Sequence, residues 1–285
     1  MRRSIRSAFA ALTLAAVASM AAAASEPPGG VPMAQQACQR ACLEGFVNKY
    51  LQAMADNRVD PALFAPNARF TENGVEMPLG NEGLWATTSG LGTYKFYIPD
   101  TETQNVAFLG TVMEQASSSA TGPQREPEAV GLALRLRIVN GKITEVEQIA
   151  ARPDRPLGAT AAAAPSSPFS ATGASVEKMG APSPRFLQAV PANERMSRAD
   201  LIAVGNSYFS AIQRNEGKGY YPFTDDCLRH ENGIVTAGPP GSGARAGCAE
   251  QLRTSLIGAV TSIRDRRFVA VDRERGIVFS FAFFD

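Results

Sequence analysis

The clearest pattern in this chain is an apolar stripe that recurs with the spacing of one helix face. In the first half its members are Leu43, Phe46, Val47, Tyr50, Leu51 and Met54. In the second half, Leu201, Val204, Tyr208 and Ile212 repeat that spacing. Apolar residues three and four positions apart lie on one face of an α-helix. We therefore expect two long helices, each with one buried face.

A turn signal follows each of these helices. Glu72-Asn73-Gly74 follows the first and Glu231-Asn232-Gly233 follows the second, and a β-branched residue comes directly after each. Asn-Gly between short strand-forming runs is typical of a two-residue hairpin turn, because both central residues need a positive φ. The shared order of helix, loop and hairpin indicates an internal repeat.

Alternation predicts more strands in the first copy than in the second. From Leu132 to Ile138, apolar residues alternate with Ala or Arg, and Asn140-Gly141 then turns the chain into another strand. In the second copy we expect a helix over 249–259 and strands over 260–268 and 276–284. Nothing there corresponds to 132–149. The second copy is interpreted as C-terminally incomplete, the alternative being that another chain supplies the missing hairpin.

Composition divides the chain into five segments. Three arginines, an Ala-rich apolar run and small residues before Ser25 have the organisation of a secretory signal peptide. Residues 153–196 are rich in Ala, Pro, Ser and Gly and are expected to form a disordered linker, since they bury little apolar surface. The expected segments are a signal peptide over 1–24, a flexible leader over 25–36, domains over 37–152 and 197–285, and the linker between them.

Charge and apolar runs limit the classes of partner. The chain has 28 basic and 27 acidic residues, so electrostatics give no reason to expect nucleic acid. A run of alternating Arg and acidic residues over 264–275 is interpreted as a solvated sheet face. After the signal peptide, no stretch is apolar enough to span a bilayer. The mature protein is expected in the periplasm or outside the cell, not embedded in a membrane.

The four cysteines suit an oxidising compartment. Pairing Cys227 with Cys248 would attach a helix to the second hairpin and is the favoured disulfide. A bridge between Cys38 and Cys42 would need a distorted first helical turn, and the sequence leaves all three connectivities open. With one His and no paired Cys-x-x-Cys spacing, neither a zinc site nor another metal site is expected. No cofactor motif is present, so no cofactor is expected.

The order of elements resembles the nuclear-transport-factor-2-like cone, which includes the SnoaL-like domains. Four stretches are more narrowly similar to an uncharacterised family of secreted bacterial and fungal proteins: residues 41–44, 70–74, 83–85 and 141–147. The resemblance implies an α+β fold with two tandem cone-like repeats, each having helices packed on a curved antiparallel sheet. It also implies an apolar pocket between sheet and long helix, and two copies that pack as an intramolecular pseudo-dimer or as a homodimer.

The resemblance also implies what chemistry to look for. Enzymes of this superfamily place a carboxylate or His in the pocket as a general base, and a Tyr or a protonated acid beside an oxyanion. In the first copy, Glu72 is the candidate base, although its recurrence as Glu231 favours a structural role at the turn. Tyr94 and Tyr97 on one strand are candidate ligand-binding residues.

The second copy offers another candidate pair. His230 is the single His of the chain, and Asp226 lies four residues before it, on the same face of a regular strand. A surface His or a core His with satisfied hydrogen bonds is the competing interpretation. Trp85, the single Trp, is a candidate floor of a ligand pocket, and burial in the core is the competing interpretation.

The sequence thus favours an exported, non-catalytic module that binds a small apolar ligand or a partner in the cell envelope. The alternative is a cofactor-independent acid–base enzyme, such as an isomerase, a dehydratase or a cyclase, acting on a small hydrophobic substrate. A pocket in which Glu72 or His230 converges with a Tyr would favour the enzyme.

Overall fold

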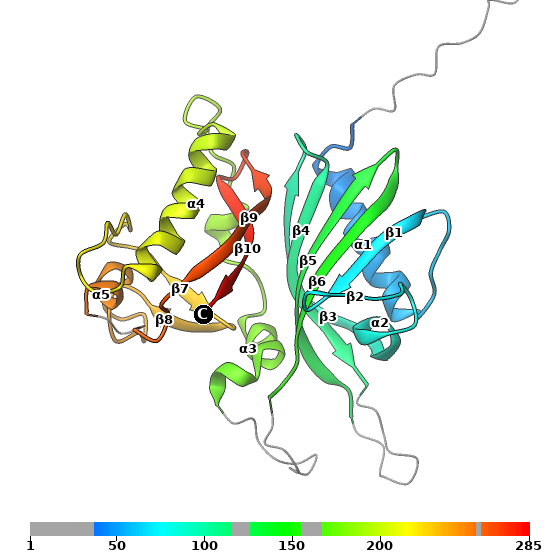
Figure 1. The fold of residues 1–285 in the computed structure, drawn as a ribbon, viewed down its shortest axis with the longest axis horizontal. Helices are drawn as coiled ribbons and strands as arrows, with labels where there is room; N and C mark the ends of the chain where they lie inside the picture. Colours follow the sequence, from blue (N-terminus) through cyan, green and yellow to red (C-terminus); the bar gives the residue numbers. More distant parts are fainter. Residues whose placement is uncertain (1–36, 116–125, 155–166, 255–257) are drawn as a thin grey trace, which may run out of the picture. The chain divides into compact units, whose positions relative to one another are not determined.

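A curved six-stranded sheet forms the centre of the first half of the chain (Figure 1). The computed structural model describes residues 37–115, 126–154, 167–254 and 258–285. The expected signal peptide and leader lie outside the described residues. The strand order is β2-β1-β6-β5-β4-β3. The strands are β1 (Phe64–Glu72), β2 (Val75–Glu76), β3 (Thr88–Asp100), β4 (Asn105–Glu114), β5 (Glu128–Val139) and β6 (Lys142–Ala151).

Two helices cover the inner face of this sheet: α1 (Arg40–Ala55) and α2 (Gly83–Thr87). The first predicted apolar stripe is confirmed, since its members are buried except for the half-buried Phe46. The second stripe is buried only in part, because Leu201 and Ile212 are buried but Val204 is 54% exposed. The predicted hairpin turns are confirmed as well. Asn73 and Gly74 have φ values of 50° and 81°, and Asn232 and Gly233 have 50° and 82°, so both central residues have the positive φ that the turn requires.

Large side chains fill the space between the sheet and α1. Tyr50, Trp85 and Phe108 have no exposed surface, and the rings of Tyr50 and Trp85 meet edge to face with centroids 5.3 Å apart. The family resemblance implies a ligand pocket in this space. The side chains found there form the hydrophobic core of the first half instead.

The second half repeats part of this order. Helix α4 (Arg198–Gln213) packs on two antiparallel strands, β9 (Ile263–Asp272) and β10 (Ile277–Phe284). The hairpin of β7 (Arg229–Glu231) and β8 (Ile234–Ala237) is a separate two-stranded sheet, and α5 (Cys248–Arg253) follows it. The prediction of a helix over 249–259 was too long. Strand β9 begins later than predicted and continues through the apolar residues 269–271.

The expected disordered linker is corrected in its described part. Residues 167–196 contain two 3-10 turns, η1 (Pro168–Ser170) and η2 (Pro184–Leu187), and the helix α3 (Thr172–Met179) between them. Helix α3 packs on β3, β4 and β5. Gly173 permits this contact, because a Cβ there would lie 2.0 Å from the carbonyl oxygen of Ala129. Composition indicated little burial, but a few small and apolar residues suffice to dock this short helix.

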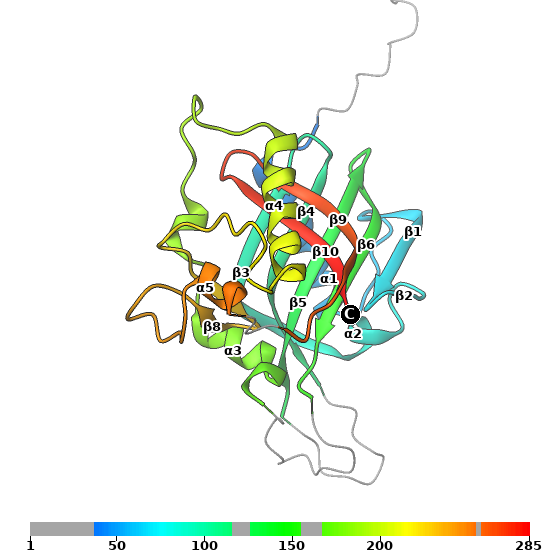
Figure 2. The same cartoon turned by 60° about the vertical axis from the view of Figure 1, so that its left-hand side comes forward.

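The outer face of the six-stranded sheet packs against β9 and β10 (Figure 2). Tyr94, Phe96 and Ile98 of β3 belong to one buried cluster with Phe279 and Phe281 of β10. Among the described residues, no helix is long and apolar enough to cross a membrane.

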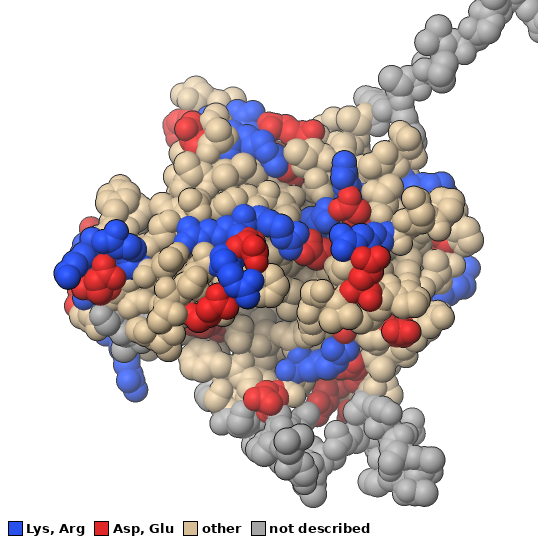
Figure 3. Space-filling view, in the orientation of Figure 1, with Lys and Arg blue, Asp and Glu red and all other residues tan. Residues whose placement is uncertain are grey.

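Ion pairs surround this packed cluster. The expectation of a solvated face over 264–275 holds in part, since Arg264, Asp265, Arg267 and Arg273 are exposed whereas Asp272 is buried. Arg267 pairs with Glu147 of β6, and Arg273 Nη1 lies 2.9 Å from Glu102 Oε1. Arg40 Nη2 of α1 lies 2.7 Å from Asp272 Oδ1. Acidic and basic side chains accordingly alternate across the face shown in Figure 3. Partners far away in the sequence supply these contacts, so the local charge pattern indicated only that both signs were present.

Candidate functional site

A cavity of about 300 Å³ lies on the outer face of the sheet. Strands β3 to β6 form its floor, α3 forms a wall, and the turn between β7 and β8 completes it. Apolar side chains and glycines predominate in its lining. None of the lining residues, all of which belong to the described part of the chain, is Lys, Arg, Asp or Glu.

Small residues at outward positions of neighbouring strands make the floor shallow. Gly131 of β5 is opposite Ala151 of β6, and Ala133 is opposite Ile149. Successive side chains of a strand point to opposite faces, so Leu132 and Leu134 fill the inner core while Gly131 and Ala133 face outward. A larger side chain at Ala133 would occupy the space that is now the cavity, whereas a Cβ at Gly131 would lie 2.7 Å from Thr172 Cγ2 of α3.

A single carboxylate fixes the helix that forms the wall. Glu177 of α3 accepts hydrogen bonds from Thr93 N (2.8 Å), Thr93 Oγ1 (2.5 Å), Tyr94 N (3.3 Å) and Thr111 Oγ1. Partial burial raises the pKa of this carboxyl, but the hydrogen bonds from Thr111, Thr93 and Tyr94 outweigh it, and the net pKa is lowered. Val176 and Met179 of the same helix line the cavity.

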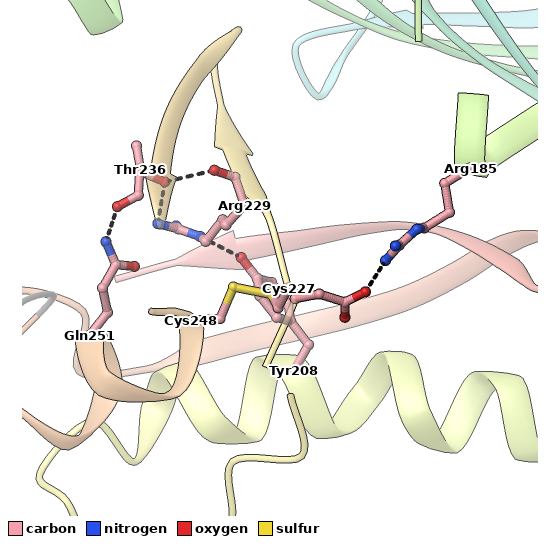
Figure 4. The surroundings of a disulfide bond; sticks show 8 residues. Arg185, Tyr208, Cys227, Arg229, Thr236, Cys248 and Gln251 are labelled. Atoms are coloured by element: carbon pink, nitrogen blue, oxygen red, sulfur yellow. Dashed lines mark hydrogen bonds and ion pairs between the residues drawn. A yellow bond between two sulfur atoms is a disulfide. The ribbon is translucent and has the colours of Figure 1, made fainter. Parts of the chain in front are cut away.

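A disulfide and a hydrogen-bond network hold the hairpin that completes the cavity (Figure 4). Cys227 precedes β7 and is bonded to Cys248 at the start of α5. Arg229 donates to Tyr208 Oη and to Thr236 Oγ1, both at 3.0 Å. Gln251 of α5 donates to the carbonyl oxygen of Thr236. These contacts fix the strand that carries His230.

Both expected disulfides are present, Cys227–Cys248 and Cys38–Cys42, with Cα atoms 6.1 Å and 5.3 Å apart. Helix α1 begins at Arg40, between Cys38 and Cys42. The bridge therefore spans the start of the helix, where the backbone can accommodate it. Two disulfides are consistent with an extracellular protein.

Two of the candidate polar residues line the same cavity. Tyr94 and His230 both belong to its lining, although they come from different halves of the chain. Neither side chain forms a hydrogen bond or an ion pair with another residue that the structure describes. Burial raises the pKa of the Tyr94 hydroxyl, so this group keeps its proton at neutral pH.

Glu72 lies elsewhere, at one end of the inner core, and is 4% exposed. Its Oε2 accepts from the backbone N of Leu84 at 2.8 Å and from Gln148 Nε2 at 2.9 Å, and its Oε1 lies 3.0 Å from Arg152 Nη1. Gln148 in turn accepts from Tyr50 Oη at 2.7 Å. The carboxylate thus joins β1 to α2 and β6, and both of its oxygens have partners.

The other candidates do not meet at the cavity. Trp85 is fully buried in the inner core. Tyr97, on the opposite face of β3 from Tyr94, donates to Asn48 Oδ1 at 2.7 Å. Asp226 is exposed and lies 2.7 Å from Arg185 Nη1, and no hydrogen bond joins it to His230 within the described part of the chain. The structure therefore brings together Tyr94 and His230 but not the pair Asp226 and His230.

Sequence reasoning missed the residues that shape the cavity. Ala133 and Gly131 could have been recognised from the sequence as a shallow part of the sheet, because they are smaller than the outward residues found further along β5. Glu177 could not have been recognised, since its partners are more than 60 residues away in the sequence. The cavity itself depends on the packing of α3 and the second hairpin.

Comparisons with known proteins give one family and several distant structures. The family model described as "Domain of unknown function (DUF8021)" matches residues 36–150 and 194–285. No curated protein matches the chain.

Solved structures match about two fifths of the chain. AclR, a putative hydroxylase from Streptomyces galilaeus, is 18% identical with a TM-score of 0.32, over 39% of this chain and 80% of that one. IdmH, a putative polyketide cyclase from Streptomyces antibioticus, is 18% identical with a TM-score of 0.31, over 38% and 91%. A cystatin-like protein of unknown function from Methylobium petroleophilum is 18% identical with a TM-score of 0.30, over 44% and 86%.

Proposed function

The chain belongs to the DUF8021 family, which carries no assigned activity, and from this premise we propose that it binds a small apolar ligand in the outer-face cavity. The observation that carries the proposal is the cavity itself. It is mainly apolar, has two polar side chains without partners among the residues that the structure describes, and lies at the small end of ligand sites in general. The inner core, in contrast, is filled by side chains such as Trp85.

We further propose that the protein is exported and that its two halves are tandem copies which pack as a pseudo-dimer. The two disulfides and the basic, Ala-rich N-terminus support export. The matched segments of the family model and the recurring helix and Asn-Gly hairpin support the two copies. In this arrangement the second copy covers the outer face of the first and completes the cavity.

Filling the cavity tests ligand binding. Ala133→Leu adds a side chain on the floor and should lower the affinity for a neutral aromatic probe such as 2-acetonaphthone by about tenfold or more, since overpacking costs roughly 1–3 kcal/mol. Calorimetric titration of the full chain measures this. Ala174→Leu is the matched control, because Ala174 is an exposed residue of α3 outside the cavity. Equal binding by wild type and Ala133→Leu would place the ligand elsewhere.

A cofactor-independent acid–base enzyme is the second candidate. One observation favours it, namely that His230 and Tyr94 line the same cavity. In such an enzyme, the His230 imidazole would remove a proton α to a ketone while the Tyr94 hydroxyl donates a hydrogen bond to the ketone oxygen. Return of the proton from the imidazolium to the α-carbon of the enolate would reverse this step, and its delivery to another carbon of a conjugated enolate would complete an isomerisation.

Exchange of α-hydrogens for deuterium tests this candidate. Wild-type protein should accelerate the exchange in 2-tetralone, an enolisable ketone, as followed by NMR in heavy water. His230→Gln should reduce the rate at least about 100-fold, the lower range for loss of a general base, and should leave probe binding intact. Bound ketone with no exchange above the uncatalysed rate would favour the non-catalytic module.

A further inference from the structure

We infer that the ligand is an uncharged ring compound whose acceptor oxygen binds the hydroxyl of Tyr94. The inference rests on the proposed function, a small apolar ligand in this cavity, and adds which polar atom that ligand carries and which residue recognises it. It makes Tyr94 the specificity-determining residue of the cavity.

The surroundings of Tyr94 supply the first argument. Its side chain is 7% exposed and packs in the cluster with Phe96, Phe279 and Met179. Its hydroxyl has no hydrogen-bond partner among the described residues, yet its oxygen is not one of the fully enclosed polar atoms that lack a partner. The oxygen therefore keeps some accessible surface, and Tyr94 is one of the residues that line the cavity.

The state of that hydroxyl determines what it can bind. Burial raises its pKa, so it remains protonated at neutral pH and can donate a hydrogen bond. Covering this donor with a ligand that offers no acceptor is unfavourable. A ligand that brings a carbonyl or ether oxygen to this point relieves the cost, and a pure hydrocarbon does not.

The lining disfavours a charged ligand. None of the described residues that line the cavity is lysine, arginine, aspartate or glutamate, so a ligand ammonium group would lose its hydration without gaining an opposite charge, and a carboxylate would find only the exposed imidazole of His230. The neighbouring carboxylate is Glu177, and four hydrogen bonds from Thr93, Tyr94 and Thr111 already occupy it.

The floor favours a ring. Gly131, Ala133 and Ala151 leave a shallow area of sheet, with Leu109 and Ile149 beside it. A planar group can lie against this floor while Val176 and Met179 of α3 contact its other side. Apolar contact of this kind would supply most of the affinity, and Tyr94 would supply the selectivity.

Three probes that share one ring system test the inference with the full chain. 2-Acetonaphthone has a ketone, 2-isopropenylnaphthalene has a methylene group in place of that oxygen, and 2-naphthoate has a charged carboxylate. Wild type should bind the ketone about fivefold more tightly than the hydrocarbon, the effect of one net hydrogen bond. The carboxylate should bind at least about tenfold more weakly than the ketone.

Two substitutions on one strand provide the matched comparison. Tyr94→Phe should bring the ratio between ketone and hydrocarbon to about one and leave hydrocarbon affinity within about twofold, since only an oxygen is removed. Tyr97→Phe removes the equivalent hydroxyl oxygen three residues further along β3. The Tyr97 hydroxyl donates to Asn48 on the other face of that strand. This second substitution should preserve the wild-type ratio.

The outcomes separate the two proposals. Tight binding of both neutral probes with equal affinity, or an unchanged ratio in Tyr94→Phe, would overturn the role of Tyr94 and leave the proposed function intact. Preferred binding of 2-naphthoate would overturn the uncharged ligand class. Failure of wild type to bind either neutral probe would overturn the proposed function together with this inference.

Discussion

Glu72 and Glu231 occupy matching places in two Asn-Gly hairpins, yet their surroundings differ. Glu72 is buried and accepts from Leu84 N and Gln148 Nε2, whereas Glu231 is about half exposed and pairs with Arg229 within its own hairpin. The same residue type can therefore have a structural role in one hairpin and almost none in the other.

Substitution of the two glutamates should reveal this difference. Glu72→Ala leaves two buried donors without an acceptor and should lower the free energy of unfolding by about 3 kcal/mol, since each such donor costs roughly 1–3 kcal/mol. Glu231→Ala, the matched control, should change it by no more than about 0.5 kcal/mol. Urea unfolding measures both values. An unchanged stability in Glu72→Ala, with loss of ketone exchange, would instead indicate a catalytic Glu72.

From the sequence we could name the residues that are able to carry chemistry, but not which of them lie close together. Tyr94 and His230 were both candidates, and the structure places both at one cavity. Asp226 was the expected partner of His230 from strand periodicity. Strand β7 begins only at Arg229, however, and Asp226 lies outside it. The rule that residues four apart share a face therefore does not apply to this pair.

At the scale of elements, helix α3 links the floor of the cavity to the second hairpin. Glu177 binds it to β3 and β4, and the side chain of Asn232 donates to the carbonyl oxygen of Phe169 just before it, at 2.9 Å. The helix has only eight residues, so its stability depends on these contacts more than on its own hydrogen bonds.

Acid should weaken the docking of α3 and with it ligand binding. The pKa of Glu177 is lowered in the folded protein, so its contribution is complete above the ordinary glutamate value of about 4.3 and is lost as the pH falls below it. Affinity for 2-acetonaphthone, measured from pH 7 down to pH 3.5, should decline in that range. Glu177→Gln should have weaker affinity at pH 7 and a flatter profile, and an identical profile in the variant would contradict this role.

Elements with a strong local signal were predictable from the sequence. The apolar stripes predicted α1 and α4, and the Asn-Gly pairs predicted the turns, because spacing and positive φ are local properties. Helix α3 was missed, since its stability comes from residues 66 to 84 positions away. Strand β9 begins three residues later than predicted, at Ile263, and Arg264 beside that start pairs with Asp285.

At the scale of the whole molecule, the second half supplies apolar side chains and ion-pair partners to the first half. Phe279 and Phe281 cover the outer face, and buried ion pairs join the halves. Asp100, which is fully buried, accepts from the backbone N of Val271 at 3.0 Å and lies 2.7 Å from Arg198 Nη2. Charges buried in this way are costly to leave unpaired, so these contacts also define how the halves meet.

This arrangement explains why the cavity could not be found from the sequence. A family resemblance directs attention to the space between sheet and long helix, where Tyr50, Trp85 and Phe108 are packed. The cavity lies on the opposite face of the same sheet and needs Ala133, α3 and the turn at Asn232 together. None of these segments indicates a ligand site when considered separately.

Hydrogen exchange of the full chain, measured by mass spectrometry with and without saturating 2-acetonaphthone, tests the location of the site most directly. We predict slower exchange in α3 and at the turn around Asn232, with no change in α1 and α2. Slower exchange confined to α1 and α2, with α3 unaffected, would place the ligand in the inner core and contradict the account.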